Sequence, residues 1–186
     1  MTPIRPDGIA VFGSSEPLPG DPLYEQAYDL GRLLALAGHG IVTGGYGGVM
    51  EAASRGAVEA GGRAVGVCCA IFPDRGPNPY LDDVVSSADL FERTRELVRR
   101  ARAFVVLRGK AGTLAELAFL WALHRAGCLE RRPVVLLGGK WSQLIDHLAS
   151  SEMLDAPQIE ITRLAAHADE VVEILNQLLA AEDPGP

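Results

Sequence analysis

Lysine is nearly missing from this chain, and acidic residues outnumber basic ones. Only Lys110 and Lys140 are lysines among 17 basic residues, and the formal net charge is -7. A protein that binds extended nucleic acid presents many basic side chains to the phosphate backbone, and no basic stripe occurs here. The composition therefore argues against extended nucleic acid as a partner. Neither lysine lies in a pattern that marks a pyridoxal phosphate site.

Cysteine, histidine and long apolar runs are also scarce. The three cysteines, Cys68, Cys69 and Cys128, lack the spacing of metal ligands, and the four histidines are scattered. We therefore expect no disulfide framework, no metal and no cofactor. The start Met-Thr-Pro-Ile-Arg has no apolar signal region, and no run approaches the roughly 18 apolar residues of a membrane span. These features predict a cytoplasmic protein with no membrane partner.

Short apolar runs alternate with segments of helical period along the whole chain. Such alternation predicts an α/β, Rossmann-like fold with an open, mainly parallel sheet and helices on both faces. The length predicts a single domain over residues 1–186, with a frayed tail from about residue 180. The expected strands are Ile9–Gly13, Gly40–Thr43, Ala64–Cys68, Phe104–Leu107 and Pro133–Leu137; the expected helices are Tyr24–Ala37, Val49–Ala60, Leu90–Ala101, one from Thr113, Ser142–Leu148 and Ala168–Leu179.

Three glycine loops follow predicted strands. They are Gly13-Ser14-Ser15, Gly44-Gly45-Tyr46-Gly47-Gly48 and Gly109-Lys110-Ala111-Gly112-Thr113. Glycines let the backbone approach a ligand closely, and the free amides at a helix start favour an anion. Each loop alone is compatible with a tight turn, but three at the carboxyl ends of parallel strands predict a phosphate or nucleotide site. The G-x-G-x-x-G fingerprint and the Walker A pattern are both absent.

Glu116 and Arg93 are charged residues at unusual positions on their predicted helices. Glu116 is the only charged residue between Thr113 and His124. A carboxylate in such an apolar segment needs a helix cap, an ion pair or a role in catalysis to explain it. Thr113 and Glu116 stand three apart at a helix start, and a capping box explains both without chemistry. Arg93 falls on the border of the apolar stripe of its helix, where it could reach an anion or simply cover the edge of the core.

These residues, in this order, resemble the LONELY GUY (LOG) family. The resemblance rests on Gly13-Ser14-Ser15, the segment Thr43–Ala53, Arg93, and the pattern Gly109-x-x-Gly112-Thr113-x-x-Glu116, and it covers roughly residues 8 to 150. Members of that family are Rossmann-like and often dimeric, and they were long labelled possible lysine decarboxylases. Characterised members release the base from cytokinin or purine nucleoside 5′-monophosphates, giving ribose 5-phosphate.

The resemblance implies a role for each matching residue. It identifies Arg93 and Glu116 as catalytic. The phosphate- or nucleotide-binding residues expected from the three loops are Ser14, Ser15, Gly44, Gly45, Gly47, Gly48, Met50, Gly109, Lys110, Gly112 and Thr113. Four positions depart from the family pattern. Arg108 and Lys110 alter the usual Pro-Gly-Gly-x-Gly-Thr, Thr94 replaces the lysine that commonly follows the arginine, and Tyr46 replaces a glycine.

The function that this resemblance implies is hydrolysis of the N-glycosidic bond of a nucleoside 5′-monophosphate, and the mechanism we expect needs no metal. The chief alternative is a non-catalytic nucleotide or molybdenum-cofactor binding protein of the same fold, which the departures favour. A dinucleotide-dependent oxidoreductase is a weaker alternative, since the fingerprint is missing. The helix Leu114–Leu123 is more apolar than contact with one sheet face requires, so we also expect a homodimer.

Overall fold

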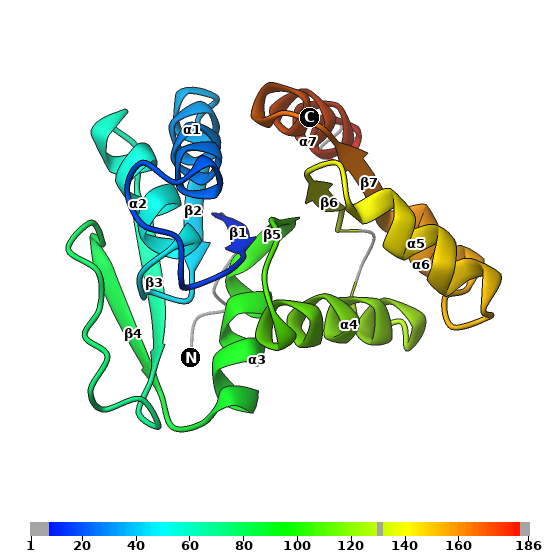
Figure 1. Ribbon diagram of the computed structural model, residues 1–186, viewed down its shortest axis with the longest axis horizontal. Helices are drawn as coiled ribbons and strands as arrows, with labels where there is room; N and C mark the ends of the chain where they lie inside the picture. The colour runs from blue at the N-terminus through cyan, green and yellow to red at the C-terminus, as the bar shows by residue number, and fades with distance from the viewer. Residues whose placement is uncertain (1–7, 130–131, 183–186) are drawn as a thin grey trace.

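The fold is organised around one parallel β-sheet. The computed structural model describes residues 8–129 and 132–182. Seven strands follow the order β4-β3-β2-β1-β5-β6-β7, and every paired register is parallel. Helices cover the sheet, as Figure 1 shows. The expected α/β, Rossmann-like fold is confirmed, and among the described strands the sheet is wholly parallel. Within those residues no helix is long and apolar enough to cross a membrane.

Strands and helices alternate for most of the chain. The part up to β4 comprises β1 (Gly8–Phe12), α1 (Pro22–Leu36), β2 (Gly40–Thr43), α2 (Val49–Glu59), β3 (Ala64–Cys69) and β4 (Asp83–Ser87). The remainder comprises α3 (Leu90–Arg100), β5 (Ala101–Val106), α4 (Ala111–Arg125), β6 (Val134–Leu137), α5 (Trp141–Ser150), α6 (Ala156–Ile161), β7 (Thr162–Ala165) and α7 (Ala168–Glu182).

Two hydrophobic clusters lie on opposite faces of the sheet. Along β1, Ile9 and Val11 point into one cluster, while Ala10 and Phe12 point into the other. This is the two-residue period of a strand buried on both faces. The first cluster joins α1, α2 and α7, and the second joins α3, α4, α5 and α6. Figure 1 shows α1, α2 and α7 along the upper side and α3 and α4 below.

Three short elements escaped the sequence patterns. β4 and β7 lie at the two edges of the sheet and are mostly exposed or half-buried, so neither shows a continuous apolar run. α6 has only six residues, which is too few for helical periodicity to be visible. The segment Phe72–Tyr80, which is rich in proline and glycine, is a loop. α7 ends at Glu182, three residues beyond the expected helix end at Leu179. Residues 183–186 of the predicted tail lie outside the described residues.

The chain order creates a crevice beside β1. From β1 the chain proceeds to β2, β3 and β4 on one side, and β5, β6 and β7 lie on the other. Connections therefore leave the carboxyl ends of β1 and β5 in opposite directions. In open parallel sheets this switch point is where ligands bind. The loops after β1 and β5 are the first and third glycine loops, so topology places both at the crevice.

Close packing of α1 on α2 depends on two glycines. A Cβ atom on Gly31 would lie 2.0 Å from the carbonyl oxygen of Ala53, and one on Gly56 would lie 2.0 Å from that of Tyr28. Both contacts involve backbone, which cannot rotate away. A larger residue at either position must therefore push the two helices apart.

We expect Gly31→Ala and Gly56→Ala each to lower the free energy of unfolding by about 1–3 kcal/mol, the usual cost of overpacking. Chemical denaturation measures the change. Gly76→Ala is the control, because a Cβ there meets nothing within 4 Å and should change stability by about 0.5 kcal/mol or less. An equal effect at all three positions would contradict the close-packing explanation.

Candidate functional site

A cleft lies at the carboxyl edge of the sheet, over the crevice between β1 and β5. Its volume is about 240 Å³. The three glycine loops, the start of α3 and the first two turns of α4 form its walls. The lining residues are Val11, Phe12, Gly13, Ser14, Ser15, Glu16, Gly44, Tyr46, Met50, Phe72, Arg75, Leu90, Arg93, Lys110, Gly112, Thr113 and Glu116.

Arg93 is the buried cation of this cleft. It projects from the first turn of α3, and its exposed fraction is 9%. Its Nε donates to the carbonyl oxygen of Val67 at 2.9 Å, and Nη2 donates to that of Gly44 at 3.1 Å. Nη1 lies 3.5 Å from Oε1 of Glu116, and the guanidinium lies 5.6 Å from the ring centre of Tyr46. Neutral carbonyls and one carboxylate thus compensate the burial of this charge.

Gly44 is required by the position of the arginine. A Cβ atom at this residue would lie 1.6 Å from Nη2 of Arg93 and 2.7 Å from Sδ of Met50. No side chain fits there while the guanidinium keeps its place. Gly44 is therefore needed to leave room for the Arg93 side chain.

Glu116 belongs to α4 but does not cap it. The helix begins at Ala111 with Lys110 as its N-cap, so Thr113 and Glu116 both lie inside the helix. The capping-box explanation is therefore wrong, because the helix starts two residues earlier than Thr113. The Glu116 side chain, with 15% of its surface exposed, turns to Arg93 instead. The only charged residue of the apolar stretch is thus paired across the cleft.

Burial gives Glu116 an unusual titration. Removal of its carboxyl group from water raises its pKa to about 7, and the positive charge of Arg93 partly opposes that rise. A carboxyl group with a pKa near 7 exchanges its proton near neutral pH. Such a group can act as an acid or a base under cellular conditions.

Backbone hydrogen bonds hold the three glycine loops together. The amide of Ser14 donates to the carbonyl of Arg108 at 3.1 Å, and the amide of Val49 donates to the carbonyl of Ser14 at 2.9 Å. Gly48 has a φ of 71°, and a Cβ there would lie 2.4 Å from the carbonyl oxygen of Ser14. The glycine allows the close approach that joins the first two loops. One loop cannot move far without the others.

The structure divides the predicted binding residues into two groups. Those whose atoms line the cleft are Ser14, Ser15, Gly44, Met50, Lys110, Gly112 and Thr113, together with Arg93 and Glu116. Gly45, Gly47, Gly48 and Gly109 do not line it. Gly45 has a φ of 79°, and a Cβ on Gly109 would lie 2.0 Å from Oγ1 of Thr113. These two glycines are therefore required by the conformation of their loops.

The four departures from the family pattern have different locations. Tyr46 is buried: its hydroxyl accepts from the Cys69 amide at 2.8 Å and donates to the Cys69 carbonyl at 3.1 Å. Nζ of Lys110 lies 2.6 Å from Oε1 of Glu16, and both side chains are exposed. Thr94 donates to the carbonyl oxygen of Leu90 within its own helix. Arg108 lies outside the cleft, in the adjoining hollow.

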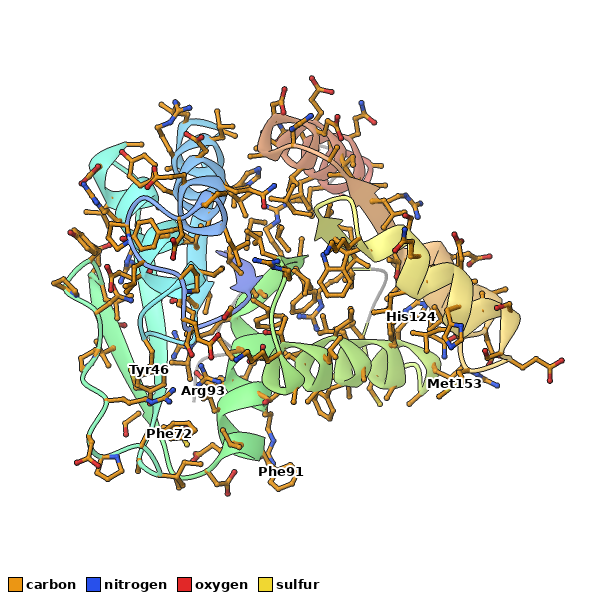
Figure 2. The ribbon with its side chains drawn as sticks, in the orientation of Figure 1. Tyr46, Phe72, Phe91, Arg93, His124 and Met153 are labelled. Atoms are coloured by element: carbon orange, nitrogen blue, oxygen red, sulfur yellow. The ribbon has the colours of Figure 1, made fainter. Side chains whose placement is uncertain are left out.

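Several cleft residues carried no sequence signal. Phe72 and Arg75 come from the loop between β3 and β4, with the Arg75 guanidinium 5.3 Å from the centre of the Phe72 ring. The Phe72 ring meets Tyr46 edge-on at 5.9 Å. Figure 2 shows Tyr46, Phe72 and Arg93 close together. A Pro/Gly-rich loop offers no periodicity from which this fold-back could be predicted.

Metal binding has no obvious donor set in this region. Within residues 8–129 and 132–182, the structure contains no group of three or more His, Cys, Asp or Glu side chains that could hold an ion. What the cleft offers instead is a buried carboxyl–guanidinium pair beside a helix N-terminus. The fold is thus that of an α/β protein whose cleft combines a helix N-terminus, which favours anions, with a titratable acid.

Comparison with known proteins identifies the family of this chain. The chain belongs to the SLOG cluster4 family, whose profile matches residues 7–164. It is 32% identical to the cytokinin riboside 5′-monophosphate phosphoribohydrolase of Mycobacterium marinum over 181 residues, covering 95% of this chain and 94% of that protein. The resemblance to the LOG family is thereby confirmed.

Solved structures of similar fold include proteins named for the molybdenum cofactor. The molybdenum cofactor binding protein of Rippkaea orientalis superposes with a TM-score of 0.72 at 26% identity, covering 94% of this chain and 98% of that one. The Moco carrier protein of Chlamydomonas reinhardtii gives 0.71 at 26% identity, covering 95% and 99%. These likenesses confirm the Rossmann-like fold.

The raised pKa of Glu116 predicts a pH-dependent stability. The unfolded carboxyl titrates near 4.5 and the folded one near 7, so the folded state holds the proton more tightly. The stabilisation is complete below about 4.5 and is lost as pH rises to about 7. Relative to Glu116→Gln, the free energy of unfolding of the parent should therefore fall between pH 5 and pH 8. A difference that stays constant over this range would contradict the raised pKa.

Proposed function

We propose that this protein hydrolyses the N-glycosidic bond of a nucleoside 5′-monophosphate, releasing the base and ribose 5-phosphate. The observation that carries the proposal is the Arg93–Glu116 pair on the cleft wall, formed by residues from two different helices. The two residues that the family resemblance implies as catalytic, 23 positions apart in sequence, thus meet in one cleft. The phosphoribohydrolase activity for which the similar mycobacterial protein is named supports the same reaction class.

The start of α4 is the best place for the phosphate. Gly112 and Thr113 line the cleft within the first turn of this helix, where free amides and the helix dipole favour an anion. Ser14 and Ser15 offer hydroxyls from the opposite loop. Lys110 stands at the rim with a flexible ammonium group, which can leave Glu16 for a phosphate oxygen. These contacts fix the nucleotide without taking part in bond breaking.

Glu116 is placed to assist the bond breaking itself. Cleavage of the bond between C1′ and the base nitrogen builds positive charge on the ribose, which a nearby carboxylate stabilises. Glu116 accepts a proton from the attacking water, whose oxygen bonds to C1′, and the proton ends on the departing base. Its pKa of about 7 suits both transfers. Arg93 orients the carboxylate and stabilises its charged form.

A non-catalytic carrier of a related ligand is the second candidate. The solved structures named for the molybdenum cofactor favour it, since two of them match this fold over most of both chains. Lysine decarboxylation has no such support: Lys110 pairs with Glu16 at the rim, and Lys140 is exposed in the loop after β6. Incubation with a panel of nucleoside monophosphates, with free base and ribose 5-phosphate as readouts, separates enzyme from carrier.

We expect Glu116→Gln to lower turnover by at least about a hundredfold, the usual scale for loss of a positioned acid or base. Binding of the monophosphate should persist, because the phosphate contacts lie at the start of α4. Steady-state kinetics and calorimetry measure the two effects. Arg93→Ala should also reduce turnover, since it releases the carboxylate.

Glu173→Gln is the matched control, because Glu173 is exposed on α7 and does not line the cleft. Its turnover should equal that of the parent. If Glu116→Gln cleaves as fast as the parent, the acid has no catalytic role. If the parent binds monophosphates and releases no base from any of them, the carrier function is supported instead.

We also propose that the chain forms a homodimer through α4. Leu114 and Phe119 on this helix are 45% and 40% exposed, and the small residues Ala115, Ala118 and Ala122 are exposed between and beyond them. An apolar helix face of this kind is typical of a subunit interface.

Sedimentation at micromolar concentration should show a dimer or larger species, and Phe119→Asp should shift it towards the monomer by burying an unpaired charge. Leu36→Asp is the control, because Leu36 is 64% exposed at the end of α1 and should leave the assembly unchanged. A parent that sediments strictly as a monomer contradicts the interface.

A further inference from the structure

A second hollow lies at the same edge of the sheet, beyond the glycine loop that follows β5. Its volume is about 520 Å³, and its lining is mostly apolar. Leu23 of α1, Leu137 of β6, and Trp141 and Leu144 of α5 form much of this surface. We call it the Trp141 hollow. Neither the proposed reaction nor the Arg93–Glu116 pair uses it.

The Trp141 hollow connects to the cleft through shared walls. An intermediate hollow of about 590 Å³ shares Ser14, Glu16 and Lys110 with the cleft. The same intermediate hollow shares Leu23, Arg108 and Gly109 with the Trp141 hollow, along with Pro22. A groove therefore extends along the carboxyl ends of β1, β5 and β6, and the start of α4 lies partway along it.

Three basic residues line this groove, in a chain with a net charge of -7. Both lysines of the chain, Lys110 and Lys140, line it, and Arg108 lies between them. Two carboxylates also line the intermediate hollow: Glu16 is paired with Lys110, and Asp21 accepts a hydrogen bond from the Leu18 amide at 2.8 Å. The intermediate hollow thus has two basic and two acidic residues, and Lys140 in the Trp141 hollow adds one further positive charge. Arg108 and Lys110 are the side chains that can meet a negatively charged linker along this groove.

The loop after β6 keeps the Trp141 hollow open. Gly138 has a φ of 118°, and a Cβ on Gly138 or Gly139 would meet nothing within 4 Å. Both glycines line the hollow, and neither places a side chain in it. Trp141 is 93% buried, with its Nε1 donating to the Leu137 carbonyl at 3.2 Å, so its ring is fixed rather than free to fold into the hollow.

We propose that the Trp141 hollow binds an aromatic group attached to the distal phosphate of a nucleoside diphosphate. The nucleoside lies in the cleft, the two phosphates lie along Lys110 and Arg108, and the aromatic group contacts Trp141 and Leu144. The proposal rests on the phosphate position given under the proposed function, but not on hydrolysis. Ligands of this class are dinucleotides and related diphosphate esters.

The test compares three ligands of increasing length by calorimetry: adenosine 5′-monophosphate, adenosine 5′-diphosphate, and two adenosines joined through a 5′,5′-diphosphate. The joined compound should bind at least about tenfold more tightly than the diphosphate, because stacking adds apolar contact that the diphosphate lacks. Equal affinity for these two compounds would overturn the proposal.

Trp141 supplies a second readout. The chain has two tryptophans, so Trp121→Phe leaves Trp141 as the only strong fluorophore. The joined compound should change its emission, and the monophosphate should not. Unchanged emission on saturation with the joined compound would place the aromatic group elsewhere and contradict the proposal. Calorimetry on the parent protein keeps the test valid if that variant folds poorly.

Two variants locate the gain in affinity. Leu144→Glu and Lys140→Glu should each remove most of the tenfold advantage of the joined compound and leave monophosphate binding unchanged, since neither residue lines the cleft. An advantage that survives both substitutions in folded protein, checked by circular dichroism, contradicts the assignment. Failure of hydrolysis leaves all of these binding results intact, so the two proposals fail separately.

Discussion

The site depends on the burial of one guanidinium group. Arg93 sits where α3 starts, and water reaches only 9% of its surface. A buried cation is costly unless polar groups surround it. Carbonyl oxygens from β3 and from the loop after β2 supply part of this environment, and Glu116 of α4 supplies the remainder. Four segments must therefore keep their relative positions for the cation to be tolerated.

The same constraint sets the properties of the acid. Glu116 lies in a cleft wall that excludes most water, so its pKa rises even though a cation is near. A more exposed carboxylate would ionise fully and respond little to the neutral pH range. A carboxylate with closer contact to the arginine would lose its basicity. The 3.5 Å separation, together with burial, leaves the proton exchangeable near neutrality.

Backbone proximity explains why glycines gather at this edge of the sheet. Gly44 makes room for Arg93, Gly48 for the Ser14 carbonyl, and Gly109 for the Thr113 side chain. These glycines allow the close contacts within and between the three loops. Tyr46 shows that one position of the second loop tolerates a large residue, because its ring packs beside the guanidinium and its hydroxyl bonds to the Cys69 backbone. The departure at Tyr46 thus supports the arginine and leaves the cleft open.

The sequence alone determined the parallel α/β fold and the three glycine loops. It also identified Arg93 and Glu116 as candidate functional residues. Apolar runs and helical stripes are local signals, and they persist wherever an element is buried. Edge strands such as β4 carry no such stripe, and the loop bearing Phe72 and Arg75 has no period at all. For Glu116, the sequence was compatible with two explanations, a helix cap and a catalytic role. Only the tertiary structure decided against the cap, because the helix start and the distance to Arg93 depend on contacts between segments far apart in the chain.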